Sequence, residues 1–142
     1  MEVKIKKLME NAVIPSYAKP GDAGMDLTAL YGEFGKYGEF IYHTGIAMEI
    51  PEGYVGLIFP RSSNRETEAY MTNHVGVIDS GYRGEILITF KNRDVDNTIP
   101  PYQPGNKVAQ IIIIPYPRIE YKVVDELSKT ERGTGGHGST GK

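Results

Sequence analysis

Short stretches of alternating apolar and polar residues, or of β-branched and aromatic residues, recur along the chain between glycines and prolines. The clearest are residues 3–6, 46–50, 54–59, 85–91 and 111–114. Alternation with a period of two and short β-branched runs are typical of strands. Many short strands with turn residues between them predict an all-β fold, a sandwich or a barrel.

Only one stretch indicates a helix. Ser63 and Glu66 form the S-x-x-E pattern of a capping box, which predicts a short helix near residues 64–70. The 17 glycines and 9 prolines interrupt the other helix-sized windows. We therefore expect functional side chains on loops and strand ends, within one domain, as 142 residues and the lack of a linker indicate.

Composition excludes several classes of function. The chain has no cysteine, which removes disulfides, thiolate chemistry and cysteine-based zinc sites. Its net charge of −2, without a run of lysine or arginine, does not favour binding to nucleic acid. No apolar run approaches the ~20 residues of a membrane helix, and no secretory signal is evident. We expect a cytoplasmic protein, or one of the host cytosol if its source is a virus, without a membrane partner.

Two segments place charged and hydroxyl side chains at predicted turns. Asp22 and Asp26 flank a glycine turn, which indicates either a simple tight turn or a carboxylate near a metal ion or its water shell. Arg61, Ser62 and Ser63 stand where a strand gives way to the predicted helix. That junction is either an ordinary N-cap or an anion site at the helix start.

Two further segments interrupt apolar runs. The apolar run before Asp79-Ser80-Gly81-Tyr82 and the strand after it predict a β-hairpin over residues 73–86. Taken alone, Asp79 is interpreted as a turn residue. A tight hairpin could also bind the edge of a nucleotide base through main-chain hydrogen bonds, with Tyr82 packed under the sugar ring. Gln110 lies in an apolar strand, either facing solvent or aimed into a shared site.

The C-terminal residues 132–142 are rich in glycine. Such a segment has little to bury and much backbone entropy to lose, which indicates a flexible arm. Alternatively, its unobstructed N–H groups wrap a phosphate, to which Arg132 adds a fork of donors.

Taken together and in this order, five segments resemble the trimeric dUTP pyrophosphatase (dUTPase) family: residues 21–27, 60–63, 76–85, 107–110 and 132–141. The resemblance implies a small antiparallel jelly roll of the β-clip type over residues 1–127, assembled as a threefold homotrimer. It also implies that the flexible arm, residues 128–142, closes over a neighbouring subunit's site. One chain would supply the Pro60 and Gln110 segments, a second the hairpin and a third the arm.

The implied reaction is hydrolysis of dUTP to dUMP and pyrophosphate, which keeps uracil out of DNA and supplies dUMP for dTTP synthesis. Asp79 matches the catalytic aspartate that activates the attacking water and contacts the 3′-hydroxyl. Mg²⁺ is expected to bind mainly through the substrate triphosphate, as the cofactor. Asp26 and Gln110 would reach it through water, with no direct protein ligand.

The resemblance assigns the remaining substrate contacts by group. Some residues bind phosphates, some read uracil, one packs on the deoxyribose and some close the site from the arm. They are Arg61, Ser62, Ser63 and Gln110 for the phosphates; Asn73, Gly76, Val77 and Ile78 for uracil; Tyr82 for the sugar; Arg132 for the γ-phosphate; Gly138, Ser139 and Thr140 as arm donors; and His137, where relatives often place Phe, for stacking over uracil.

Three other functions remain open. dCTP deaminase (or a bifunctional deaminase) shares this fold but needs a glutamate as general acid and base, and Thr89 stands in its place. A regulatory binding protein that switches with nucleotide state would use an arm that orders on dUTP. An inactive structural trimer is the third, and the presence of Asp79, Arg61, Gln110 and Arg132 speaks against it.

Overall fold

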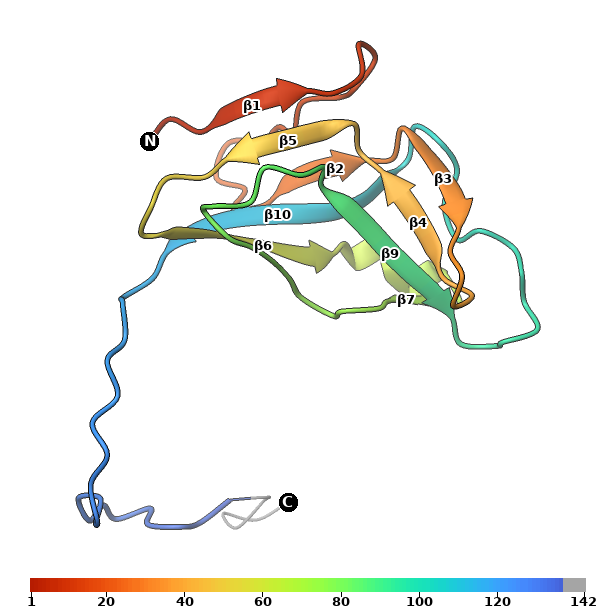
Figure 1. Ribbon diagram of the computed structural model, residues 1–142. Helices are drawn as coiled ribbons and strands as arrows, with labels where there is room; N and C mark the ends of the chain where they lie inside the picture. Colours follow the sequence, from red (N-terminus) through yellow and green to blue (C-terminus); the bar gives the residue numbers. More distant parts are fainter. Residues whose placement is uncertain (137–142) are drawn as a thin grey trace.

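The computed structural model, which describes residues 1–136, contains two four-stranded antiparallel sheets and a two-stranded sheet. The sheet orders are β2-β10-β6-β8, β3-β4-β9-β7 and β1-β5 (Figure 1). The strands are β1 Lys4–Lys7, β2 Met25–Thr28, β3 Tyr31–Phe34, β4 Phe40–His43, β5 Ile46–Glu49, β6 Tyr54–Pro60, β7 Ala69–Met71, β8 Gly76–Ile78, β9 Leu87–Asn92 and β10 Lys107–Pro115. The predicted all-β antiparallel jelly roll is confirmed.

The core is formed by residues from both four-stranded sheets and from β5. Within the core, two hydrogen bonds join Tyr42 of β4 to Tyr102 of the loop before β10. The Tyr42 hydroxyl accepts the Tyr102 N–H at 2.9 Å and donates to the Tyr102 carbonyl at 3.1 Å. Burial raises the pKa of Tyr42 to about 12. These bonds hold that loop on the sheet and so fix where β10 begins.

β10 is the central strand on the functional side of the molecule. It pairs with β2 and with β6, so that Ala109 lies opposite both Leu27 and Pro60. Val108, Ala109 and Ile111 are buried, whereas Gln110 is half-buried. Gln110 is the cross-strand partner of Asp26, which places the two side chains on one face of the sheet.

Every strand predicted from the sequence is present, with small shifts at its ends. Residues 3–6 and 46–50 form β1 and β5, which pair with each other, and residues 54–59 form most of β6. Residues 85–91 correspond to β9, which begins two residues later, and residues 111–114 lie inside the longer β10. Local alternation and short β-branched, aromatic or apolar runs were therefore sufficient signals for these elements.

The predicted helix near residues 64–70 is wrong in extent. The chain forms a single 3₁₀ element, η1 Ser62–Glu66, and leaves helical conformation at Thr67, with φ −109° and ψ 156°. The N-cap position is held by Arg61, which makes no side-chain cap bond, and Ser63 lies inside the element, where its hydroxyl accepts an Arg61 guanidinium N–H at 3.2 Å. Residues 69–71 pair with β9 as β7, burying Ala69 and Met71.

The predicted hairpin over residues 73–86 is also wrong. Its first arm, β8, pairs with β6, and its second arm continues into β9, which pairs with β4 and β7 in the other sheet. The turn itself exists, since the Tyr82 N–H donates to the Asp79 carbonyl at 3.0 Å. The two arms separate because each pairs with strands of a different sheet.

After β10 the chain leaves the sheets, as the blue segment in Figure 1 shows. Residues 116–132 are exposed and contribute no strand. Within residues 1–136, no helix has the length and apolar character needed to cross a membrane.

Candidate active site

Three charged side chains meet where β2, β6 and β10 come together. Arg61 follows the end of β6, Asp26 lies on β2 and Lys107 opens β10. The Arg61 Nε lies 2.7 Å from Asp26 Oδ1, and the Lys107 Nζ lies 2.7 Å from Asp26 Oδ2. Two cations thus share one carboxylate, which leaves one net positive charge at this edge.

The ionised form of Asp26 is favoured by its neighbours. Burial acts to raise the pKa of Asp26, but the hydrogen bonds and charges of Lys107 and Arg61 outweigh it and hold the pKa below its usual value. The Asp26 side chain is 14% exposed and that of Arg61 is 30% exposed. Both oxygens of the Asp26 carboxylate are therefore engaged by cations, while part of the Arg61 guanidinium still faces solvent.

Gln110 lies beside this charged cluster. Its Nε2 donates to the Pro60 carbonyl at 3.1 Å, which ties the side chain to the end of β6. Its Oε1 lies over Gly24, where an added Cβ would collide with it. Gly24 thus permits the close approach of Gln110, and the segments 21–27, 60–63 and 107–110 converge at one place.

The Asp79–Glu85 turn is the second part of the candidate site. The Tyr82 hydroxyl donates to the Glu85 carbonyl at 2.9 Å, and the Tyr82 ring lies over Gly84, where a Cβ would collide with ring atoms. Arg83 Nη1 donates to the carbonyls of Ser80 at 2.7 Å and Tyr82 at 2.9 Å. The turn is thus held by its own side chains.

A cavity of about 160 Å³ opens beside this turn. Asp79 and Tyr82 are exposed at it, and the Asn73 amide lies over Gly76, the first residue of β8. The cavity is lined by Val77, Ile78, Asp79, Tyr82, Glu85 and Leu87. Apolar side chains, a free carboxylate and exposed strand backbone therefore meet in one concave place.

The two parts lie at opposite ends of β6. Ile78 pairs with Gly56, whereas Arg61 follows Pro60 at the other end of the strand. At ~3.3 Å per residue, the strand from Gly56 to Arg61 covers roughly 17 Å. One chain therefore does not bring Asp79 and Arg61 together.

The arm supplies a third, separate group. Arg132 is exposed and its Nε donates to the Gly135 carbonyl at 3.1 Å. It lies in the segment that has left the sheets (Figure 1). His137, Gly138, Ser139 and Thr140 lie outside the described residues.

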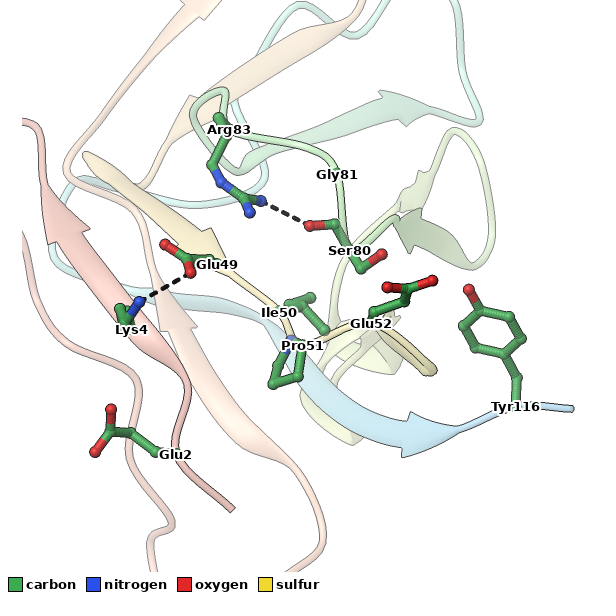
Figure 2. A pocket seen from close by; sticks show the side chains of 10 residues that line it. All are labelled: Glu2, Lys4, Glu49, Ile50, Pro51, Glu52, Ser80, Gly81, Arg83 and Tyr116. Atoms are coloured by element: carbon green, nitrogen blue, oxygen red, sulfur yellow. Dashed lines mark hydrogen bonds and ion pairs between the residues drawn. The ribbon is translucent and has the colours of Figure 1, made fainter. Parts of the chain in front are cut away.

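A larger hollow lies elsewhere, next to Ser80 and Gly81, with a volume of about 520 Å³ (Figure 2). It carries three carboxylates, Glu2, Glu49 and Glu52. Its two cations are already engaged, Lys4 by Glu49 at 3.0 Å and Arg83 by main-chain carbonyls. This hollow therefore does not suit a polyphosphate, and the smaller cavity at Asp79 does suit an uncharged base.

Two contributors were not assigned from the sequence. Lys107 was recognised only as part of a motif, and Glu85 was not singled out. The contact of Lys107 with Asp26 depends on the register of β2 with β10, which the sequence alone does not show. The contacts of the Glu85 carboxylate with Gly45 and His43 join segments about 40 residues apart, and they too are visible only in the fold. In the part of the chain that the structure describes, no three acidic or histidine side chains gather as a metal site.

Comparison with known proteins assigns the family. The dUTPase family model matches residues 10–141. The deoxyuridine 5'-triphosphate nucleotidohydrolase of Dictyoglomus turgidum is 38% identical over 154 residues, which cover 99% of each chain. That of Cutibacterium acnes is 39% identical over 130 residues, covering 90% of this chain and 85% of the relative.

Two solved structures have the same fold. A mutant of the Staphylococcus bacteriophage 80alpha dUTPase with dUpNHpp has a TM-score of 0.82 at 29% identity, covering 99% of each chain. A mutant of the dUTPase from phage phi11 of S. aureus, in which a structural Mg(II) ion is coordinated, has a TM-score of 0.72 at 29% identity, covering 89% of this chain and 98% of that one. The chain belongs to the dUTPase family.

Proposed function

We propose that this protein hydrolyses dUTP to dUMP and pyrophosphate. The match to the dUTPase family over residues 10–141 carries the proposal, and relatives that share nearly the whole chain are named deoxyuridine 5'-triphosphate nucleotidohydrolases. The two groups of residues described above fit the two ends of such a substrate. The cavity at Asp79 suits a nucleoside and the cluster at Arg61 suits phosphates.

Asp79 acts as the general base in this proposal. Its carboxylate is exposed at the cavity and free to hold a water molecule. That water attacks the α-phosphorus in line with the departing pyrophosphate, a reaction that depends on positioning and on neutralised charge. Arg61 supplies the charge, with Ser62 and Ser63 beside it and Gln110 as a neutral donor.

Asp26 and Gln110 would hold Mg²⁺ through its water shell, with the ion bound mainly by the substrate triphosphate. Both Asp26 oxygens already face cations at 2.7 Å, so this carboxylate fits a place one water away from the ion rather than direct coordination. Mg²⁺ keeps several waters in such sites, and Gln110 is a second outer partner. When bound, the ion neutralises phosphate charge, and the side chains orient its water shell.

Each active site is shared within a homotrimer. Asp79 must reach the α-phosphorus whose oxygens Arg61 and Gln110 hold, yet within one chain the two groups lie roughly 17 Å or more apart along β6. A neighbouring subunit resolves this by presenting its own Asp79 turn. The arm, residues 128–142, comes from a third subunit, with Arg132 at the γ-phosphate and Gly138, Ser139 and Thr140 as donors.

Uracil is recognised by the backbone of residues 77–79, with Asn73 and Gly76 shaping the approach, and His137 stacks over the base from the arm. Tyr82 packs against the deoxyribose, where a 2′-hydroxyl would clash. A soft pocket would discriminate against the thymine methyl by only about 1–3 kcal/mol, so rejection of dTTP depends on the rigidity of this turn.

The deaminase alternative lacks its acid and base. Thr89 is half-buried, its hydroxyl hydrogen-bonds that of Thr72, and a threonine hydroxyl does not carry out the required proton transfer. For the regulatory alternative, every strand within residues 1–136 belongs to one of the three sheets, which leaves no strand for an added domain in the described part of the chain.

Product analysis with four nucleotides tests the proposal. We expect pyrophosphate from dUTP, far less from dTTP, dCTP and UTP, and no ammonia from dCTP. Asp79→Asn should lower the rate by about 10²- to 10⁴-fold. Equal turnover of dTTP, or ammonia from dCTP, would refute the assignment.

A further inference from the structure

Glu85 connects the Tyr82 turn to the core of the protein. Its carboxylate Oε1 accepts the Gly45 N–H at 2.7 Å, and its Oε2 lies 2.9 Å from His43 Nδ1. Its main-chain carbonyl accepts the Tyr82 hydroxyl at 2.9 Å. The same residue therefore binds the β4–β5 corner with its side chain and Tyr82 with its backbone.

The corner that Glu85 holds is rigid. Gly45 has φ +67°, and an added Cβ would lie 2.9 Å from Leu30 Cδ2 and 3.0 Å from Ala12 Cβ, so the backbone is closely surrounded. Thr44 is 1% exposed and its hydroxyl donates to the Ile86 carbonyl at 2.7 Å. The Ile86 N–H donates to the Ile46 carbonyl at 2.9 Å. Residues 85 and 86 are thus fixed to a buried part of the fold.

His43 holds the Glu85 carboxylate from the other side. Its ring is stacked on Tyr31, with centroids 4.2 Å apart and planes 9° apart, and its Nε2 lies 3.3 Å from Glu33. The His43 side chain is 14% exposed and that of Glu85 is 23% exposed. Partial exclusion of water strengthens this contact relative to a surface pair.

We propose that Glu85, held by Gly45 and His43, is a positioning residue that fixes the Tyr82 ring and thereby sets the preference of the enzyme for dUTP over UTP. This inference rests on the proposed function, in which Tyr82 packs on the deoxyribose. A ring held at one end by a hydrogen bond to a fixed carbonyl cannot move aside for a 2′-hydroxyl. When the contacts of Glu85 are lost, the Tyr82 ring can move away from the sugar, and the kcat/KM for UTP rises relative to that for dUTP.

The test is the ratio of kcat/KM for dUTP to that for UTP in full-length variants. Glu85→Ala should lower this ratio about fivefold or more, the factor that corresponds to ~1 kcal/mol for a lost hydrogen bond. His43→Ala should lower it less, because Gly45 still holds the carboxylate. Glu85→Gln should restore most of the ratio, because its amide oxygen still accepts the Gly45 N–H.

Glu33→Gln is the matched control. It removes a charge that contacts His43 but does not touch Glu85 or Tyr82, so the ratio should stay at the wild-type value. Thermal unfolding of each variant separates loss of fold from loss of discrimination. If Glu85→Ala does not fold, Tyr82→Phe decides, since it deletes only the hydroxyl that reaches Glu85 and should lower the ratio by a similar factor.

The results that would overturn this inference differ from the result that would refute the proposed function. A folded Glu85→Ala enzyme with the wild-type ratio, or with equal losses on both nucleotides, overturns the inference, as does an unchanged ratio in Tyr82→Phe. Further loss when Glu85→Ala is added to Tyr82→Phe also overturns it, because the two changes break the same link. Wild-type protein that does not prefer dUTP would instead refute the proposed function itself.

Discussion

The charges around Asp26 decide how the proposed phosphate side of the site is arranged. Arg61 and Lys107 each engage one oxygen of this carboxylate, so Asp26 sets the direction of the Arg61 guanidinium. The sequence revealed Asp26 and Arg61 as members of two separate motifs. It did not reveal their contact with Lys107, because that contact depends on the pairing of β2 with β10 across about 80 residues of chain.

Removing the charge of Asp26 should destabilise the protein in a pH-dependent way. The pKa of Asp26 is lowered in the folded state, so the carboxylate contributes stability above the ordinary aspartate pKa and loses it as pH falls through the folded value. Asp26→Asn should lower the free energy of unfolding by about 2 kcal/mol at neutral pH. Urea unfolding at fixed protein concentration measures this difference.

Urea unfolding of wild type and Asp26→Asn at acid pH tests whether charge causes the difference in stability. Below pH ~4 the wild-type carboxylate begins to lose its advantage, so the two proteins should approach each other in stability. A constant difference from neutral to acid pH would show that packing, rather than charge, explains the effect.

At the level of elements, the local sequence pattern predicted where most strands lie, but it did not predict which strands pair. Local pattern was enough to place β1, β5, β6, β9 and β10, through alternation in the first two and β-branched, aromatic or apolar runs in the other three. It was not enough for β8, whose partner is β6 rather than the next strand in sequence. It also failed for η1, because Arg61 rather than Ser63 holds the N-cap position and makes no side-chain cap bond.

The Asp79–Glu85 turn offers a matched pair of glycine substitutions. A Cβ at Gly84 would collide with the Tyr82 ring, whereas one at Gly81 would meet open space. Gly84→Ala should therefore raise the KM for dUTP about tenfold by displacing the ring, a loss of ~1.4 kcal/mol in binding. Gly81→Ala should change it less than about twofold.

Steady-state kinetics on the two variants makes the comparison, with thermal unfolding as a control for fold. Equal effects at both positions would mean that backbone freedom of the turn, not the place of the Tyr82 ring, governs binding.

On the scale of the whole molecule, the account depends on subunits sharing a site. The phosphate cluster and the Asp79 cavity lie at opposite ends of β6, and the chain after β10 leaves the sheets with Arg132 on it (Figure 1). In the proposed trimer, a single chain therefore supplies two half-sites and an arm. This feature was expected only from family resemblance, since no local pattern in the sequence carries the spacing between Arg61 and Asp79.

Mixed trimers test this sharing with full-length chains. Asp79→Asn and Arg61→Gln should each be nearly inactive alone. Refolded together in equal amounts, they should recover activity at about one site in four, because a neighbour with intact Asp79 meets a chain with intact Arg61. Activity no greater than the sum of the separate variants would place both residues in one chain.

Hydrolysis of dUTP in H₂¹⁸O with Mg²⁺, followed by mass spectrometry of the products, is the most direct test of the proposed reaction. Attack of a water held by Asp79 on the α-phosphorus predicts dUMP that carries one ¹⁸O and pyrophosphate that carries none. Label in pyrophosphate, or formation of dUDP and phosphate, would contradict the account.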